Sequence, residues 1–391
     1  MDNVTHTLVG ITLARTPLGR AGRGATTALV LASNAPDVDV VSLARGTASY
    51  MHWHRGPTHG PIGIVCLGLA SAAIAWWWEA WLRPRAPAAD ADVGTRAVGQ
   101  ASFPMLAAIA MLGVAVHILM DLPTSYGTRL LSPFDWHWYA FDWMPIIDIY
   151  LLIILAAGLF FGRGSDAARR RNAALVLALM AANYGLRAAA HHNAIALAPR
   201  LFGPTLPARC ADAPDTSAVL DYWPRRNPEP STQNSEPREP ASLNPLPATR
   251  RCLLEVAAIP TFFSPLDWRI IAHTSNSYDA RDVSLTDARL RAPASAGEVL
   301  WRQTVRYPNV WTPAATHAAS APLAQIFLGF SRFPAARSST DTSGTTTVRF
   351  IDMRFAVGLI ALEQPVRRPE PFSATIRVAP GGAILGQSLG R

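Results

Sequence analysis

The first half of the sequence carries His and Asp residues in five short patterns. They are His6 in T-H-T-L-V-G, Asp37 and Asp39 in P-D-V-D, His54, Arg55 and His59 in H-W-H-R-G-P-T-H, His117 and Asp121 in H-I-L-M-D, and the isolated Asp148. Imidazole and carboxylate ligands without neighbouring cysteine suit zinc, manganese or iron. These residues therefore predict a divalent metal site, with zinc as the first candidate.

His117 and Asp121 are four residues apart, so on a helix they share one face and lie one turn apart. That spacing allows both to bind one ion or to bridge two. Ionisable groups inside a membrane span are costly and rarely face lipid. The alternative is a structural His–Asp hydrogen bond, because polar pairs also join membrane helices. The spacing alone leaves both interpretations open.

The other two polar motifs are weaker when taken alone. Asp37 and Asp39 point to the same side if the chain there is extended, although a helix cap with a solvated acid is the commoner arrangement. His54 and His59 flank Arg-Gly-Pro-Thr, and the tight turn that Gly and Pro favour could bring the two imidazoles together. This is not a helical zinc motif of the H-E-x-x-H type.

Several polar residues could support such a site. Arg55 and Arg187 could hold an anionic substrate or stabilise charge in a transition state. For Arg187 the commoner role is to extend to the interface from a helix end. Thr58, Thr124 and Ser125 could donate hydrogen bonds that orient the ligands.

Long apolar stretches must position these residues. Four are long enough to cross a bilayer, which takes about 20 helical residues: Gly60–Leu82, Phe103–Leu122, Met144–Gly162 and Asn172–Ala190. Val4–Ala14 and Ala25–Ala35 are shorter and are predicted to be re-entrant or interfacial helices. The fold class predicted for residues 1–200 is therefore mainly α, a polytopic membrane helical bundle.

Antiparallel crossing would bring the polar residues to one membrane face. His59 begins the first span, Asp121 ends the second, Asp148 begins the third, and His191 and His192 end the fourth. The loops at the opposite face, residues 83–102 and 163–171, contain seven Arg, whereas residues 123–143 contain only one. The positive-inside rule places the Arg-rich loops in the cytoplasm and both chain ends outside it, although five further Arg within residues 1–59 weaken that assignment.

The second half of the chain has a different composition. Residues 201–250 are rich in Pro, Ser, Asn and Glu and predict an extended linker. Residues 251–391 predict a soluble β-rich domain, from β-type runs at Leu253–Ile259, Trp268–His273, Trp301–Tyr307, Gln325–Phe330, Val348–Phe355 and Ala374–Val378. If this domain is extracytoplasmic, Cys210 and Cys252 can form a disulfide.

Taken in order, M-D-N-V-T-H-T-L-V-G, P-D-V-D, H-R-G-P-T-H-G, H-I-L-M-D-L-P-T-S-Y-G and L-L-S-P-F-D…I-I-D resemble a bacterial family of inner-membrane metal-dependent hydrolases. The resemblance covers residues 1 to about 160. That family is distantly similar to zinc-dependent phospholipase C and related zinc nucleases. The resemblance implies a site made of His6, Asp37, Asp39, His54, His59, His117, Asp121 and Asp148. Gly60 departs from it, since a small hydroxyl residue is expected after T-H.

The function expected is a membrane-bound metal-dependent hydrolase that cleaves a phosphoester or ester of a lipid-like substrate. The predicted metal ligands are His6, Asp39, His54, His59, His117, Asp121 and Asp148, and the predicted catalytic residues are Asp37, Asp39 and Arg55. The alternative is a non-enzymatic membrane protein for metal binding, transport or scaffolding. Polar residues that stop near one face, apart from Asn183, favour the enzyme over a transporter.

Composition limits the partners and the location. The net charge of +8 comes from Arg alone, and no basic stretch interleaved with aromatics indicates nucleic-acid binding. Membrane lipid is the expected partner, and the bacterial inner membrane is the expected location.

Overall fold

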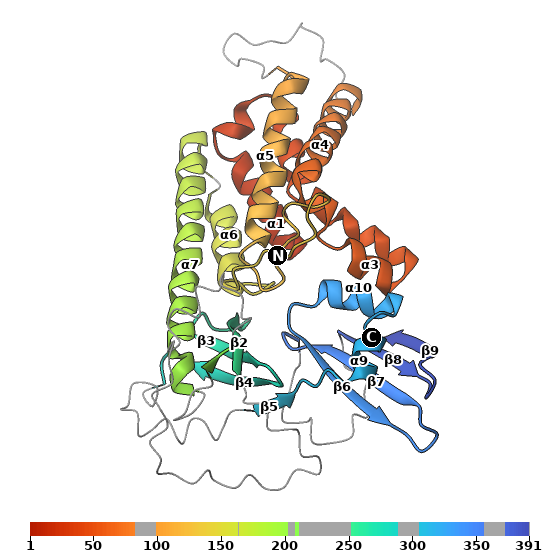
Figure 1. Cartoon of the computed structure of the whole chain (residues 1–391). Coiled ribbons are helices and arrows are strands. Elements are labelled where there is room, and N and C mark those ends of the chain that lie inside the picture. Colours follow the sequence, from red (N-terminus) through yellow and green to blue (C-terminus); the bar gives the residue numbers. More distant parts are fainter. Residues whose placement is uncertain are drawn as a thin grey trace, which may run out of the picture. The chain divides into compact units, whose positions relative to one another are not determined.

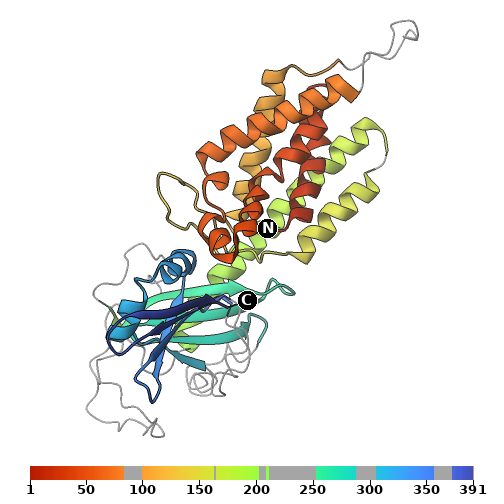
Figure 2. The same cartoon turned by 90° about the vertical axis from the view of Figure 1, so that its right-hand side faces the viewer.

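The computed structural model describes residues 1–82, 99–162, 164–201, 208–210, 252–287, 305–355 and 372–390. The chain divides into two compact units (Figures 1 and 2). Unit 1 contains Met1–Ala189 and Phe262–Pro265, and unit 2 contains Ala190–Thr261 and Leu266–Arg391.

Unit 1 is built from helices (Figure 1). In chain order they are α1 (Asn3–Ala14), η1 (Pro17–Arg20), α2 (Ala25–Ala32), η2 (Ala35–Arg45), α3 (Thr47–Trp53), η3 (Pro57–His59), α4 (Pro61–Leu82), α5 (Phe103–Asp121), α6 (Ile149–Phe161) and α7 (Asp166–Leu201), the last of which continues into unit 2. The elements labelled η are 3₁₀ helices.

Three helices within the described residues are long and apolar enough to cross a membrane: Pro61–Trp81, Phe103–Asp121 and Asp166–Ala198. The first two coincide with predicted spans. The third predicted span is a shorter helix, α6, because the chain reaches it through non-helical residues up to Asp148. The fourth is longer at both ends than predicted.

The short helices α1 and α2 each pack against neighbouring helices of the bundle: α1 contacts α2 and α6, and α2 contacts α4 and α5. One end of α2 lies beside the start of α5, where Arg23 N–H donates to the Gly99 carbonyl. At the other end, the Ser33 carbonyl meets His117 near the end of α5. Small residues permit this close packing, because a Cβ at Gly10 would lie 3.1 Å from Val30 Cα.

Arg15 marks the end of the bundle away from His117. Its guanidinium donates to the carbonyl of Leu159, at 3.2 Å, and to the carbonyls of Gly158 and Gly162 at the C-terminus of α6. A cation is favourable at this negative end of a helix dipole. Arg15 and Arg23 therefore both lie at the end of unit 1 that the predicted topology places in the cytoplasm.

The described residues of unit 2 form two β-sheets. The five-stranded sheet has the order β1 (Ala208–Arg209), β2 (Cys252–Pro260), β3 (Asp267–Thr274), β4 (Ser277–Ser284) and β5 (Val305–Pro308). The four-stranded sheet has the order β6 (Pro334–Thr340), β7 (Thr346–Asp352), β8 (Ser373–Val378) and β9 (Ile384–Leu389). The last residues of α7 pack on the first sheet, where Trp268 is fully buried.

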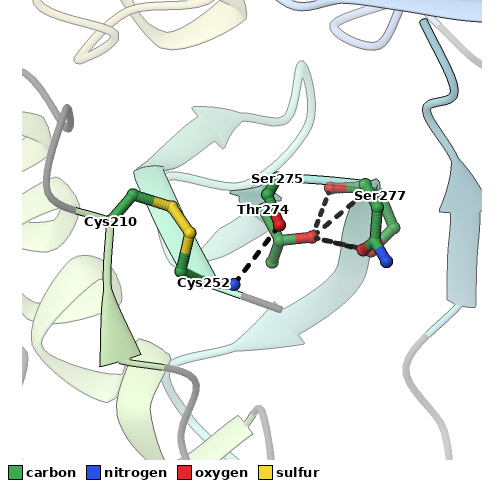
Figure 3. Close-up of a disulfide and its surroundings, with 6 residues drawn as sticks. Cys210, Cys252, Thr274, Ser275 and Ser277 are labelled. Atoms are coloured by element: carbon green, nitrogen blue, oxygen red, sulfur yellow. Dashed lines mark hydrogen bonds between the residues drawn. A yellow bond between two sulfur atoms is a disulfide. The ribbon is translucent and has the colours of Figure 1, made fainter. Parts of the chain in front are cut away.

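The predicted disulfide between Cys210 and Cys252 is present (Figure 3). Strand β1 pairs in parallel with β2, with Ala208 opposite Cys252, and this pairing brings the two cysteines together. The disulfide links the residue that follows the edge strand β1 to the first residue of β2. The rest of the predicted linker, apart from Leu201 and residues 208–210, lies outside the described residues.

One predicted strand is wrong. Gln325–Phe330 belongs to helix α10 (Pro322–Phe330), which follows the short helix α9 (Pro313–Ala318). Its buried residues Ala324, Phe327 and Phe330 are three residues apart, a helical and not an alternating spacing. The predicted runs at residues 253–259, 268–273, 348–355 and 374–378 correspond to β2, β3, β7 and β8, whereas 301–304 lie outside the described residues.

Candidate metal centre

Three elements bring the candidate ligands of unit 1 together. Helices α4 and α5 pack against each other, and His59 in η3, just before α4, lies beside His117 and Asp121 in the last turns of α5. Asp37 comes from the first turn of η2. One ligand atom from each of these four residues lies within 4.8 Å of the others.

Hydrogen bonds on the far sides of the imidazoles fix their orientation. His117 Nδ1 lies 2.8 Å from the Ser33 carbonyl oxygen, which can only accept, so Nδ1 carries the proton. Its Nε2 then keeps a free lone pair for a metal. His59 Nδ1 lies 3.0 Å from the Thr58 hydroxyl, on the side away from the centre.

The distances between the ligand atoms fit a tetrahedral ion. The Nε2 atoms of His59 and His117 are 3.3 Å apart, and Asp121 Oδ2 is 3.4 Å from each. Asp37 Oδ1 lies 3.6 Å from His117 Nε2 and 3.8 Å from His59 Nε2. Tetrahedral zinc, with bonds of about 2.0–2.1 Å, requires separations of about 3.3 Å between its ligands. The separations among His59, His117 and Asp121 match this spacing, and Asp37 lies slightly farther out, at 3.6 Å and 3.8 Å from the two imidazoles.

His6 lies directly against this group. Its ring stacks on His117 with centroids 3.7 Å apart, and its Nε2 is 3.4 Å from Asp121 Oδ1. Both ring nitrogens are buried without a hydrogen-bond partner. The α-amino group of Met1, which the sequence analysis did not consider, also pairs with Asp121 Oδ1.

Asp39 and His54 form the opposite border of the group. Asp39 Oδ2 accepts a hydrogen bond from the backbone N–H of Arg55 at 2.7 Å and lies 3.4 Å from His54 Nδ1. The same oxygen is 3.9 Å from His59 Nδ1. Asp39 is therefore adjacent to the four candidate ligands, on the ring side of His59 that faces away from His117.

The guanidinium of Arg55 is buried and turned toward a ligand. Its Nη2 lies 3.2 Å from Asp121 Oδ2, and its Nη1 donates to the Thr124 hydroxyl and the Gly127 carbonyl. Thr124 in turn donates to the Asp121 carbonyl. The predicted supporting roles of Thr58 and Thr124 thus have a structural counterpart in hydrogen bonds to the candidate ligands or to Arg55.

Two sets of predicted residues lie outside this group. Asp148 caps α6 by accepting from Leu151 N–H at 2.8 Å, and it forms an ion pair with Arg187; both side chains are fully buried. The ring of His191 packs against Trp268 within unit 2. Asp148 lies directly before α6, near the start of the predicted third span. Its partner in the structure is Arg187 and not the group of candidate metal ligands.

A pocket of about 300 Å³ opens beside the candidate ligands. It is lined by Met1, Asn3, Asp37, Asp39, Val40, Tyr50, His54, Arg55, Tyr126 and Ile146. The lining combines carboxylates, an imidazole and phenol groups with the apolar side chains of Val40 and Ile146. Tyr50 and Tyr126 were not predicted as site residues, because the spacing of neither one relates it to the ligands.

Burial sets the charge states of the groups around the pocket. Desolvation raises the pKa of Asp37 to about 6 and lowers the pKa of His54. It holds the pKa of His59 well below its ordinary value. The two imidazoles are therefore neutral at neutral pH, as metal ligands must be.

Gly60 is explained by its surroundings. A Cβ at this position would lie 2.0 Å from the Ser132 carbonyl oxygen, so the loop before α6 leaves no space for a side chain. The hydroxyl residue expected from the resemblance does not fit here. Gly60 instead allows the residue after His59 to pass close to that loop.

Comparisons with known proteins agree with a membrane assignment. Residues 1–194 match the family of the YdjM inner membrane protein. A stretch of 175 residues is 26% identical to Uncharacterized protein YfhP of Bacillus subtilis (strain 168), covering 42% of this chain and 48% of that protein. No solved structure matches the chain. The family match and the apolar helices support a bacterial inner-membrane location.

Proposed function

With residues 1–194 matching the YdjM inner membrane protein family, we propose that this part of the chain is a metal-dependent hydrolase embedded in the membrane. One observation carries the proposal. The Nε2 atoms of His59 and His117 face each other at 3.3 Å, with oxygens of Asp37 and Asp121 completing a tetrahedral spacing beside a pocket. Because His117 Nδ1 donates to the Ser33 carbonyl, its Nε2 offers a lone pair that a cation at the centre of the group can accept.

The proposed ion is zinc or another divalent metal. When bound, such an ion polarises a phosphoryl or carbonyl oxygen and lowers the pKa of a coordinated water from about 15.7 toward about 7. Asp37, His59, His117 and Asp121 would hold it. His6, beside Asp121 Oδ1, is placed to extend the ligand set.

Asp39 is the proposed general base. It lies on the pocket wall but outside the four-residue group, and the Arg55 N–H and His54 hold its carboxylate in place. A carboxylate in this position can take a proton from a water in the pocket. The substrate proposed is a phosphoester or ester of a lipid-like molecule, which the apolar side chains of Val40 and Ile146 would accommodate.

The proposed topology is multi-pass, with α4, α5 and α7 as spans and α6 as a shorter membrane helix. Helices α4 and α6 begin next to the residues that border the site, and α5 ends there. The pocket would therefore open at one face of the bilayer. Membrane lipid is the proposed partner of the chain.

The decisive experiment measures metal content and hydrolysis in the full chain purified in lipid nanodiscs. His117→Ala is expected to lose both the metal and the activity, whereas His137→Ala, which removes an exposed His outside the group, is expected to keep both. Substrate panels should include phosphomonoesters, phosphodiesters and carboxylesters. Folded, metal-loaded protein that hydrolyses none of them would contradict the enzyme and favour metal binding or transport.

A further inference from the structure

Helix η2 carries two carboxylates, Asp37 and Asp39, and four exposed aliphatic side chains. In a 3₁₀ helix, residues three apart lie one above the other. Val40 and Leu43 therefore follow Asp37 in one row, and Val38 and Val41 form the neighbouring row. These four side chains, called here the η2 patch, are each 49–65% exposed. The patch lies between Val38 and Leu43, on the same short element as Asp37 and Asp39.

Elements that η2 contacts carry further exposed apolar residues. Helix η2 packs against α3, η3 and α4. Ile62 and Val65, in the first turns of α4, are also exposed, as is Trp53 at the end of α3. Trp53 packs against Trp136, with ring centroids 5.9 Å apart. Tryptophans of this kind are enriched where a membrane protein crosses the bilayer–water interface.

Single exposed aliphatic residues need no explanation, but contiguous ones indicate a contact surface. The candidate partner is lipid, because the patch adjoins a helix that is long and apolar enough to cross a bilayer. An exposed Arg45 ends η2, and an arginine at this level can pair with anionic lipid head groups.

We propose that the η2 patch lies in the boundary between head groups and acyl chains of the bilayer, and that lipid reaches the pocket sideways along it. Val40 belongs to both surfaces, because it is part of the patch and lines the pocket. A bilayer lipid could then place its polar ester against Asp37 and Asp39 while its chains stay along Val40. The entry of a lipid substrate rests on the proposed function, whereas the membrane contact does not.

Site-specific fluorescence tests the membrane contact. The background is Cys66→Ala, which removes the one unpaired cysteine among the described residues; Cys210 and Cys252 are disulfide-bonded. Val41→Cys is labelled with an environment-sensitive fluorophore in full-length protein in phospholipid vesicles. Ile74→Cys, exposed on α4, is the bilayer control, and Thr342→Cys, exposed in the β6–β7 turn, is the water control.

The expected result is a blue-shifted emission at Val41→Cys that brominated phospholipids quench, as at Ile74→Cys. Quenching by aqueous iodide to the level of Thr342→Cys, without quenching by brominated lipid, would overturn the proposal. Shielding from both quenchers would also overturn it, because that result indicates a protein partner. None of these outcomes depends on hydrolysis, so failure of the enzymatic proposal is detected separately by the substrate panels.

Discussion

Arg55 adopts a left-handed backbone conformation, with φ of 50°, and its side chain reaches back to Asp121. From sequence, Arg55 was expected to contact the substrate. In the structure its guanidinium is divided among Asp121, Thr124 and Gly127. Its clearest role is therefore to hold a ligand carboxylate in position.

Because Arg55 contacts the candidate ligand Asp121, Arg55→Ala should weaken metal binding as well as any hydrolysis. We expect metal affinity to fall by about 10–100-fold, the usual effect of losing a group that orients a ligand. Titration of the metal into chelator-treated protein measures it. Arg129→Ala is the control, because it removes another buried Arg whose backbone N–H donates to the Arg55 carbonyl. Unchanged affinity with slower turnover would instead favour direct contact between Arg55 and the substrate.

The Asp37 carboxyl should make metal binding depend on pH. Burial raises its pKa to about 6, and the ion binds only the carboxylate form. Above about pH 6 the carboxyl is ionised, so it adds no pH dependence to the metal affinity. Below about pH 6, protons compete with the metal for the carboxylate, and the metal affinity falls by up to about tenfold per pH unit. Binding isotherms at several pH values should show this fall, and Asp37→Asn should lack it. Equal pH dependence in both proteins would contradict the assignment.

The sequence could predict His117 with Asp121 because helical spacing alone places them one turn apart. It could not separate the roles of Asp37 and Asp39. Those residues lie in a 3₁₀ helix and not in extended chain, so Asp37 faces the imidazoles while Asp39 binds Arg55 N–H. The sequence could place Asp148 near the start of a helix, but it could not predict the ion pair with Arg187. That pair depends on how α7 packs, which no local pattern reveals.

At the scale of elements, the contact between Gly60 and the loop before α6 determines how closely His59 approaches α5. Gly60→Ser is expected to destabilise the protein by about 1–3 kcal/mol, because the new Cβ collides with the Ser132 carbonyl. Gly185→Ala, where nothing lies within 4 Å of the added carbon, should be neutral or slightly stabilising. Thermal unfolding in detergent compares the melting temperatures of the two variants with that of the wild type. Equal melting temperatures for Gly60→Ser and the wild type would show that the loop around Ser132 moves to accommodate the new side chain.

Helices α4 and α5 could be predicted almost to the residue because long apolar runs have few alternatives. The short helices could not, since eleven apolar residues fit an interfacial helix as well as a buried one. The buried helix α10 shows the same ambiguity in unit 2, where a short apolar run was assigned to a strand. Strand β6 is largely polar and exposed, and the aliphatic residues of β9 are adjacent and not alternating, so neither strand carries a clear hydrophobic alternation.

For the whole molecule, the arginines and the disulfide give independent support to one topology. Arg15 and Arg23 lie at the same end of unit 1 as the start of α5, opposite the metal centre. The Cys210–Cys252 disulfide is typical of an oxidising compartment. The arginines agree with the proposal that the metal-centre end of unit 1 faces away from the cytoplasm, and the disulfide agrees with an extracytoplasmic location of unit 2.

Reporter fusions test this topology. Fusions after Arg85 and after Arg170 should report the cytoplasm, and a fusion after Pro240 should report the opposite side. Thiol titration under denaturing conditions should find only Cys66 free until a reductant is added. A cytoplasmic signal at Pro240, or three free thiols in protein isolated without reductant, would contradict the topology.

The four candidate ligands all lie between Asp37 and Asp121. In a growing chain the metal centre would therefore be fully encoded once α5 has been made, before α6, α7 and unit 2 exist. An ion bound at that stage would link η2, η3 and α5 in a partly folded chain. It would also hold α4, because His59 lies directly before this helix. Biogenesis of this protein would then depend on metal supply during synthesis, and metal-starved cells should accumulate chains degraded before the last helices dock.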